Sequence, residues 1–309
     1  MHALACPASL KGVLSAHEAA AALAEGLRGA ELLPVADGGE GTLDVLYAPL
    51  GGEWREALVH DPLGREVRAS WLLLADRVAA VESAEAIGLG LVAESERDVM
   101  RATSRGLGEL ILDATAADPA ELVVFLGGTA TVDGGLGLLE MLDRFPISVR
   151  AACDVHAPLL DAVRIFAEQK GATPEQLPEL ERRLLENPAL EPFRELPGAG
   201  AAGGLGAALA SLGAELVEGA RLVLELIEFR ERLGGADLVV TGEGTIDRST
   251  WLGKAPSTVL RVCEEAGVRC AVFGGKVLER PPGVEIHELS GDPARAREDL
   301  VELGARLEG

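Results

Sequence analysis

LVVFLGGTATVDGG occupies residues 122–135 and joins an unbroken apolar run to a glycine-rich segment. An apolar run without alternation is typical of a strand buried on both faces of a parallel sheet. The same order of strand, glycine-containing loop and helix recurs at 238–266, and a further strand at 270–273 runs into Gly274-Gly275-Lys276. Because ligands of open α/β sheets bind where such loops gather at the carboxyl ends of strands, we predict an α/β protein with its site there.

A second region has a different pattern. Residues 54–60, 66–74 and 78–83 read as three strands with few helix signals between them, which indicates an antiparallel or mixed sheet. A chain of 309 residues is also long for a single core. We therefore predict two α/β domains. One is Rossmann- or flavodoxin-like, with a mostly parallel sheet, from residues 1–45 and about 215–309, and the other has a mixed sheet from about 46–214.

Periodicity predicts the remaining elements. Ser15 followed by Glu18 forms a capping box, so a helix is expected to begin at Ala16. The predicted helices cover about 16–28, 103–117, 159–169, 174–187, 204–212, 219–233 and 256–266. The other predicted strands cover 2–6, 31–35, 122–126, 147–153, 238–241 and 270–273.

Charge and composition exclude several functions. The formal net charge of −22 argues against nucleic acid and anionic membranes as partners, and means that a phosphate site needs local positive charge or a metal ion. No apolar run is long enough to cross a bilayer, and residues 1–16 lack the basic start of a signal peptide. Without a CxxC pair, the cysteines read as reduced core thiols, so we expect a cytoplasmic protein.

Lysine usage points to phosphate. Only four of the 28 basic residues are lysine, and each of the four adjoins a glycine: Lys11, Lys170, Lys254 and Lys276. Lysine is a compact point charge, and glycine lets backbone amides approach an anion closely. The pattern favours a phosphate-binding site, although abundant glycine leaves chance as the alternative.

Four segments carry candidate chemistry. Asp37–Thr42 sets two carboxylates among three glycines, which suits Mg²⁺ or substrate hydroxyls, or else an ordinary solvated turn. Gly127–Gly135 offers amides and threonine hydroxyls to a phosphate. Gly242–Lys254 contains two carboxylates and a lysine, and Ala255 excludes a Walker P-loop. Pro197–Gly206 is apolar and glycine-rich, which favours close backbone or ligand approach at a helix start.

These motifs resemble, in order and over nearly the whole chain, the bacterial glycerate kinase family of the glycerate 2-kinase type. PVADGGEGT stands at Pro34–Thr42 and PGAGAAGGLG at Pro197–Gly206, both unchanged, and GEGxID stands at Gly242–Asp247. Shorter matches are SLKGVLSA at 9–16, PLG at 62–64, TSRGLGEL at 103–110, the loop at 127–135, CDV at 153–155 and QKGA at 169–172. The resemblance implies ATP-dependent phosphorylation of D-glycerate with Mg²⁺, 2-phosphoglycerate as the favoured product, and an active site in a cleft between two domains.

The resemblance and the requirements of phosphoryl transfer suggest roles for individual residues. The expected catalytic residues are Lys11, Asp37, Asp133 and Lys254, with the lysines on phosphate and Asp133 as base; Asp37 and Asp247 are alternatives for the base. The expected Mg²⁺ ligands are Asp37, Asp154 and Asp247. The expected partners of the glycerate carboxylate are Arg65, Arg105 and Lys170, or the amides after Gly203. The other expected substrate- or phosphate-binding residues are Gly38, Gly39, Gly127, Gly128, Thr129, Thr131, Gly203, Gly204, Gly242 and Glu243.

The chain also departs from the family pattern. Ala8 stands where the family has aspartate, Val132 where it has asparagine, and Thr245 where it has arginine. The segment between Gly137 and Ile147 is shorter than the family's. These changes leave two alternatives open: a kinase for a related small hydroxy acid, and a weak or inactive ligand-binding homologue. A homodimer is compatible with the sequence.

Overall fold

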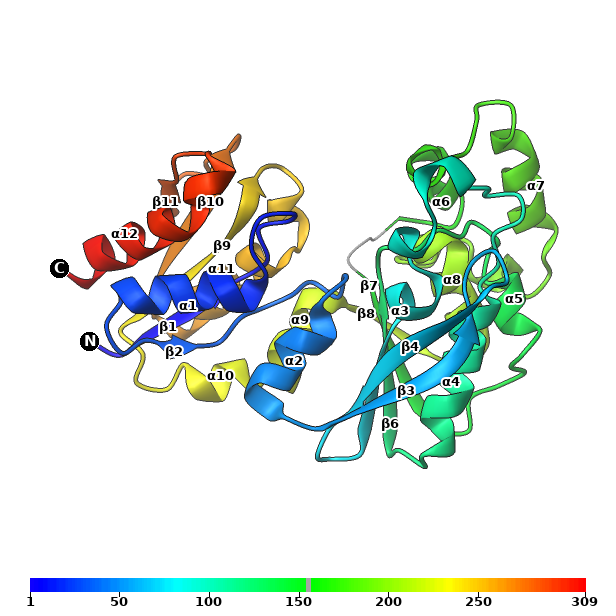
Figure 1. Ribbon diagram of the computed structural model, residues 1–309, viewed down its shortest axis with the longest axis horizontal. Helices are drawn as coiled ribbons and strands as arrows, with labels where there is room; N and C mark the ends of the chain where they lie inside the picture. Colours follow the sequence, from blue (N-terminus) through cyan, green and yellow to red (C-terminus); the bar gives the residue numbers. More distant parts are fainter. Residues whose placement is uncertain (154–156) are drawn as a thin grey trace. The chain divides into compact units, whose positions relative to one another are not determined.

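The computed structural model describes residues 1–153 and 157–309 and divides them into two compact units (Figure 1). Unit 1 comprises Met1–Asp37, Asp44–Pro49 and Ala220–Gly309, and unit 2 comprises Gly38–Leu43 and Leu50–Gly219. The PVADGGEGT string is therefore shared, with its aspartate in unit 1 and its glycines in unit 2. The two predicted domain limits stay a prediction.

Unit 1 is built on a five-stranded sheet in the order β11-β10-β9-β1-β2, in which every pairing is parallel. Its strands are β1 (Ala3–Pro7), β2 (Glu31–Leu32), β9 (Leu238–Ile246), β10 (Arg269–Val277) and β11 (Glu285–Glu288). Its helices are α1 (Ala16–Gly26), α9 (Gly219–Leu226), α10 (Phe229–Arg232), α11 (Ala255–Ala266) and α12 (Ala296–Glu308). The mostly parallel sheet that the sequence predicts is confirmed.

Helix α1 forms for the predicted reason. The Ser15 hydroxyl accepts a hydrogen bond from the Glu18 amide, and the Glu18 carboxylate accepts one from the Ser15 amide. These reciprocal bonds satisfy backbone groups that have no partner within the helix. The helix then packs tightly against α12, where a Cβ added at Gly26 would lie 2.1 Å from the carbonyl oxygen of Val301.

The predicted ends of β9 and β10 are wrong. The sequence suggests that these strands stop at Thr241 and Phe273, but they continue to Ile246 and Val277 and pair with each other throughout. The glycines that read as loop residues instead allow two backbones to lie close together. A Cβ added at Gly275 would lie 2.8 Å from the carbonyl oxygen of Gly244. The extension places Glu243 and Thr245 on a strand.

Unit 2 contains a six-stranded mixed sheet in the order β3-β4-β5-β6-β7-β8. Its strands are β3 (Glu53–His60), β4 (Glu66–Leu73), β5 (Val78–Glu82), β6 (Glu121–Leu126), β7 (Ser148–Cys153) and β8 (Glu215–Glu218). The first two pairings are antiparallel and the last three are parallel. The predicted mixed sheet is therefore confirmed.

The α-helices of unit 2 are mostly short. They are α3 (Ser83–Ile87), α4 (Arg105–Ala116), α5 (Leu136–Leu139), α6 (Asp161–Arg164), α7 (Leu177–Glu186) and α8 (Ala201–Ser211), while α2 (Thr42–Leu50) contains residues of both units. The 3-10 turns of the chain are Leu89–Leu91, Glu94–Glu96, Glu168–Lys170, Glu191–Phe193, Thr250–Leu252 and Pro293–Arg295. The predicted helix at 159–169 is thus wrong in length, because α6 ends at Arg164. No helix within the described ranges is long and apolar enough to span a membrane.

Candidate active site

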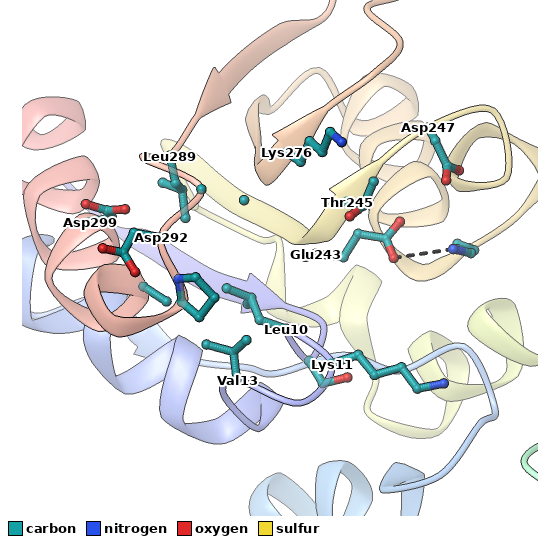
Figure 2. A pocket seen from close by; sticks show the side chains of 17 residues that line it. Leu10, Lys11, Val13, Glu243, Thr245, Asp247, Lys276, Leu289, Asp292 and Asp299 are labelled. Atoms are coloured by element: carbon teal, nitrogen blue, oxygen red, sulfur yellow. Dashed lines mark ion pairs between the residues drawn. The ribbon is translucent and has the colours of Figure 1, made fainter.

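Unit 1 contains a cavity of about 430 Å³ beyond the carboxyl ends of β1, β9 and β10 (Figure 2). This is the position at which open parallel sheets bind ligands. Its polar lining includes Lys11, Glu243, Thr245, Asp247, Lys254 and Lys276. Three of the four lysines in the chain therefore share one cavity, which brings together the lysine–glycine pairs that the sequence singled out.

Lys11 stands in a tight turn that follows β1. The turn is closed by hydrogen bonds between Leu10 and Leu14 in both directions, at 2.9 and 3.0 Å. Gly12 has a φ of 75°, a left-handed conformation that glycine adopts without strain. The Lys-Gly pair thus has a physical reason, since the glycine makes the turn and the turn presents the lysine.

Lys254 stands directly before α11 and after Gly253, whose φ is 112°. Its ammonium lies 3.5 Å from the Glu243 carboxylate, and the two side chains are 32% and 14% exposed. Burial raises the pKa of Glu243, Asp37 raises it further, and the Thr250 hydroxyl and Lys254 oppose the rise. The charge of Asp37 therefore acts on Glu243, so unit 1 groups Asp37, Glu243 and Lys254.

Asp247 completes the acidic part of this cavity. One of its carboxylate oxygens accepts hydrogen bonds from the Ser249 hydroxyl at 2.6 Å and the Ser249 amide at 2.7 Å. The Ser249 hydroxyl is the main cause that lowers the pKa of Asp247. Thr250 links the two acidic residues, because its hydroxyl donates to Glu243 at 2.7 Å and accepts from the Asp247 amide.

The donor set of this cavity fits Mg²⁺ better than a metal that needs a full protein cage. No cluster of three or more histidine, cysteine, aspartate or glutamate side chains that could hold a metal occurs in residues 1–153 and 157–309. Mg²⁺ is usually held by one or two carboxylates together with phosphate oxygens and water. Glu243 and Asp247 line the same cavity and meet that smaller requirement. Asp154, a predicted ligand, lies outside the described residues.

Unit 2 brings two of the predicted loops together. The loop Gly38–Leu43 is held by the buried Glu82 carboxylate, which accepts from the Leu43 amide at 2.7 Å and the Gly41 amide at 3.2 Å. A Cβ added at Gly127 would lie 2.8 Å from the Cα of Gly39. Gly127 is therefore required for the contact between the loops. The sequence reasoning missed Glu82, whose signal was a carboxylate at the end of an apolar strand.

Lys170 is buried beneath the second of these loops. Its ammonium donates to the Thr129 hydroxyl at 3.0 Å and to the Thr131 carbonyl at 2.8 Å, and the residue is 5% exposed. Burial lowers the pKa of Lys170 to about 7, and the negative charge of Asp133 partly opposes that shift. The lysine predicted to bind the glycerate carboxylate thus supports the loop 127–135 from within.

Asp133 is held by four donors. Its carboxylate accepts from the Ser104 hydroxyl at 2.7 Å and amide at 2.8 Å, and from the amides of Gly135 and Gly137 at 3.1 and 3.2 Å. These bonds join the start of α4 to the loop that follows β6. A carboxylate engaged in this way suits an anchor better than a general base, which needs a lone pair directed at the substrate.

Three predicted binding glycines have packing roles in the structure. Gly203 and Gly204 adopt left-handed φ angles of 80° and 95°, and a Cβ added at Gly203 would lie 2.0 Å from the Thr131 carbonyl oxygen. The Gly203 carbonyl also accepts from the Gly134 amide. A Cβ at Gly242 would lie 2.2 Å from the Phe273 carbonyl oxygen. Each position needs glycine for backbone contact, whether or not a ligand also approaches it.

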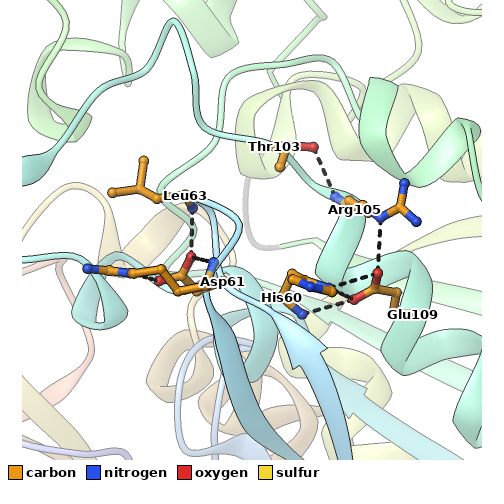
Figure 3. Close-up of polar contacts among 7 residues, drawn as sticks. His60, Asp61, Leu63, Thr103, Arg105 and Glu109 are labelled. Atoms are coloured by element: carbon orange, nitrogen blue, oxygen red, sulfur yellow. Dashed lines mark hydrogen bonds and ion pairs between the residues drawn. The ribbon is translucent and has the colours of Figure 1, made fainter.

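The two predicted arginine partners of glycerate already pair with carboxylates, and Figure 3 shows the pair formed by Arg105 and Glu109. Arg65 contacts Asp61 at 2.5 Å and Glu96 at 3.1 Å. Arg105 contacts Glu109 at 3.0 Å, and Glu109 also bonds the His60 ring. A bound carboxylate would have to compete with these pairs.

Known proteins are similar to this chain over most of its length. A family model described as the glycerate kinase family matches residues 3–145 and 142–291. Glycerate 2-kinase of Escherichia coli strain K12 is 38% identical, over 86% of this chain and 82% of that protein. Glycerate kinase of Bacillus subtilis strain 168 is 36% identical, over 94% of this chain and 88% of that protein.

A solved structure agrees with these relatives. A crystal structure from Salmonella typhimurium LT2, provisionally described as glycerate kinase 2, superimposes with a TM-score of 0.87 at 31% sequence identity. The match covers 100% of this chain and 97% of that one. The family model, the two relatives and the solved structure therefore agree on one family. The chain belongs to the glycerate kinase family and is a kinase.

Proposed function

We propose that this protein transfers the terminal phosphoryl group of ATP to D-glycerate, with Mg²⁺, and forms 2-phosphoglycerate. The relatives named for glycerate phosphorylation support the substrate, and one of them is named as a 2-kinase. The observation that carries the proposal is the grouping of Lys11 and Lys254 with Glu243 and Asp247 in one cavity of unit 1. Phosphoryl transfer depends mainly on such positioning and charge neutralisation.

In this proposal unit 1 binds the nucleotide. Lys11 and Lys254 contact phosphate oxygens, and the Lys254 ammonium exchanges part of its interaction with Glu243 for the phosphate. Glu243 and Asp247 would hold Mg²⁺, which would neutralise phosphate charge when bound. The raised pKa of Glu243 matches a carboxylate that is partly buried beside Asp37 and that gains from a nearby cation.

Unit 2 binds glycerate in this proposal. The amide of Gly128 and the hydroxyl of Thr129 lie on the loop that Lys170 supports, and the Gly38–Leu43 loop packs against Gly127 of the same loop. Asp37, directly before that loop, accepts the proton of the attacking hydroxyl, because the four hydrogen bonds that Asp133 accepts suit it to anchoring the loop. Joint action of the two sets of residues on one substrate pair, as the resemblance implies, belongs to the proposal, as does a cytoplasmic location.

The test is formation of ADP by the purified protein with ATP, Mg²⁺ and D-glycerate, followed by ³¹P NMR of the product. We expect turnover with D-glycerate and a 2-phosphoglycerate signal, and about 100-fold less turnover for Lys254→Met, since a charged contact to phosphate contributes about 1.5–3 kcal/mol. Arg306→Met, which removes an exposed charge elsewhere in unit 1, is the matched control.

Substrate specificity is tested in the same assay. Glycolate, lactate and L-glycerate each lack or misplace one group of D-glycerate, so they should be used at least tenfold less well. A faster reaction with one of them would assign the protein to a related hydroxy acid. Absence of turnover with every acid would contradict the kinase proposal.

A further inference from the structure

The cavity of unit 1 contains a third lysine that the proposed reaction has not used. Lys276 lies on β10 directly opposite Thr245 of β9, in the register that also places Gly274 opposite Glu243. Because side chains alternate along a strand, Thr245 and Glu243 point to one face of the strand pair. Lys276 shares that face, and all three residues line the cavity.

Lys276 has no acidic partner in residues 1–153 and 157–309, where no carboxylate lies within 4.0 Å of its ammonium. Every basic residue that lines the cavity is a lysine, although only four of the 28 basic residues of the chain are lysines. Lys254, by contrast, is paired with Glu243. A lysine without a carboxylate partner, directed into an acidic chain's cavity, is available to an anionic ligand.

The cavity has two ends of different character (Figure 2). Leu289 and Asp292 lie at one end, near Leu10 and Val13, while Lys276, Glu243 and Asp247 lie at the other. The volume of about 430 Å³ falls within the range of small-molecule sites. An elongated ligand with an apolar part and an anionic part fits this division.

The end of the cavity lined by Leu289 also contains two carboxylates, Asp292 and Asp299, and both have partners of their own. Asp299 accepts from the amide and the hydroxyl of Ser290 and lies 3.6 Å from Arg295. Asp292 accepts from the Ala294 amide at the start of a short 3-10 turn. These contacts hold both carboxylates at their own end of the cavity, whereas Lys11, Lys254 and Lys276 share the opposite end with Glu243 and Asp247.

We propose that Lys276 is a third phosphate-binding lysine, and that the nucleotide lies along the cavity with its base against Leu10, Val13 and Leu289. This inference rests on the proposed function, because it takes ATP as the ligand. The three lysines supply positive charge beside the phosphates, which an acidic protein must provide locally. The apolar residues supply the contact surface that a nucleobase needs.

Displacement of a fluorescent ATP analogue, by ATP or by adenosine, tests the inference without a turnover readout. Lys276→Met should weaken displacement by ATP about tenfold and leave displacement by adenosine unchanged, because only ATP carries phosphates. Val13→Ser, a neutral change at a residue that is 39% exposed in the turn, should weaken both by a similar factor. Arg306→Met should change neither.

Three results would overturn the inference: an unchanged ATP constant in Lys276→Met, an equal loss for ATP and adenosine, or no binding of the analogue by the wild-type protein. The proposed function is judged separately by glycerate-dependent ADP formation. Turnover with an unaffected Lys276→Met variant would reject the inference alone, whereas nucleotide binding without turnover on any acid would reject the function alone.

Discussion

Lys254 and Lys170 adjoin glycines in comparable motifs, yet the two units use them differently. Lys254 is one-third exposed in a cavity and shares it with two further lysines. Lys170 is 5% exposed and donates hydrogen bonds to a threonine hydroxyl and a backbone carbonyl. The comparison teaches that a motif residue can serve a site either by touching a ligand or by holding the backbone that does. The following predictions separate these two roles.

The largest effect is expected for Lys254→Met. We expect kcat/KM to fall about 100-fold while the melting temperature stays close to that of the wild-type protein, because an exposed charge is lost from a ligand site. Steady-state kinetics and calorimetry on the same preparation check both parts. A variant with a lowered melting temperature and full activity would instead give Lys254 a structural role like that of Lys170.

Asp133→Asn should show the opposite pattern. An amide nitrogen would face some of the four donors that the carboxylate now accepts, so the free energy of unfolding should fall by about 2 kcal/mol. Urea denaturation measures this loss. A fully stable variant with greatly reduced kcat would instead make Asp133 the base.

Gly127→Ala tests the contact between the two loops of unit 2. The added Cβ would lie 2.8 Å from the Cα of Gly39, so one loop must shift, at a cost of about 1–2 kcal/mol. The KM for glycerate should rise in the same variant. The control is Gly90→Ala, because no atom lies within 4 Å of the added Cβ. Gly213→Ala is unsuitable as a control, because the positive φ of Gly213 would strain an alanine. Equal stability of the 127 and 90 variants would deny that the loops are packed as described.

The smallest effect concerns pH. Burial lowers the pKa of Lys170 to about 7, below the ordinary value of 10.5, so between these values the unfolded chain binds more protons than the folded one. The free-energy cost of burying the charged Lys170 ammonium is therefore fully present below pH 7. It declines as the pH rises toward 10.5, because the buried group loses its proton first. Stability of the wild type relative to Lys170→Met should therefore increase with pH, by no more than about 1.4 kcal/mol between pH 7 and 8.

Urea midpoints of both proteins at pH 6.5, 7.5 and 8.5 measure this difference. A difference that stays constant with pH would mean that Lys170 is charged throughout the range and solvated by something other than the two observed acceptors.

Local patterns predicted much of the fold. The Ser15–Glu18 capping box, the three strands that begin the mixed sheet and the buried strand at 122–126 all form where the sequence placed them. These features depend on neighbours in sequence or on simple alternation, which a single chain displays directly. These features could be identified without knowing which other helix or strand packs against them.

Glycine was the main source of error. Gly242, Gly244 and Gly275 read as loop residues because glycine is common in turns, but here they let β9 and β10 lie side by side. A glycine in a turn and a glycine between closely paired strands look the same in a sequence. Only the register of the paired strand distinguishes them. Arg65 and Arg105 stay predicted partners of glycerate, although each forms an ion pair with a carboxylate four residues away in the sequence.

The most direct test of the contrast between the two lysines is amide hydrogen exchange, read by mass spectrometry, with and without ATP and Mg²⁺. If the cavity of unit 1 binds the nucleotide, peptides covering residues 9–14, 243–254 and 274–277 should become protected, and those covering 127–135 should not. Protection confined to 127–135, with no change in the three segments around Lys11, Lys254 and Lys276, would contradict the assignment of the phosphate site.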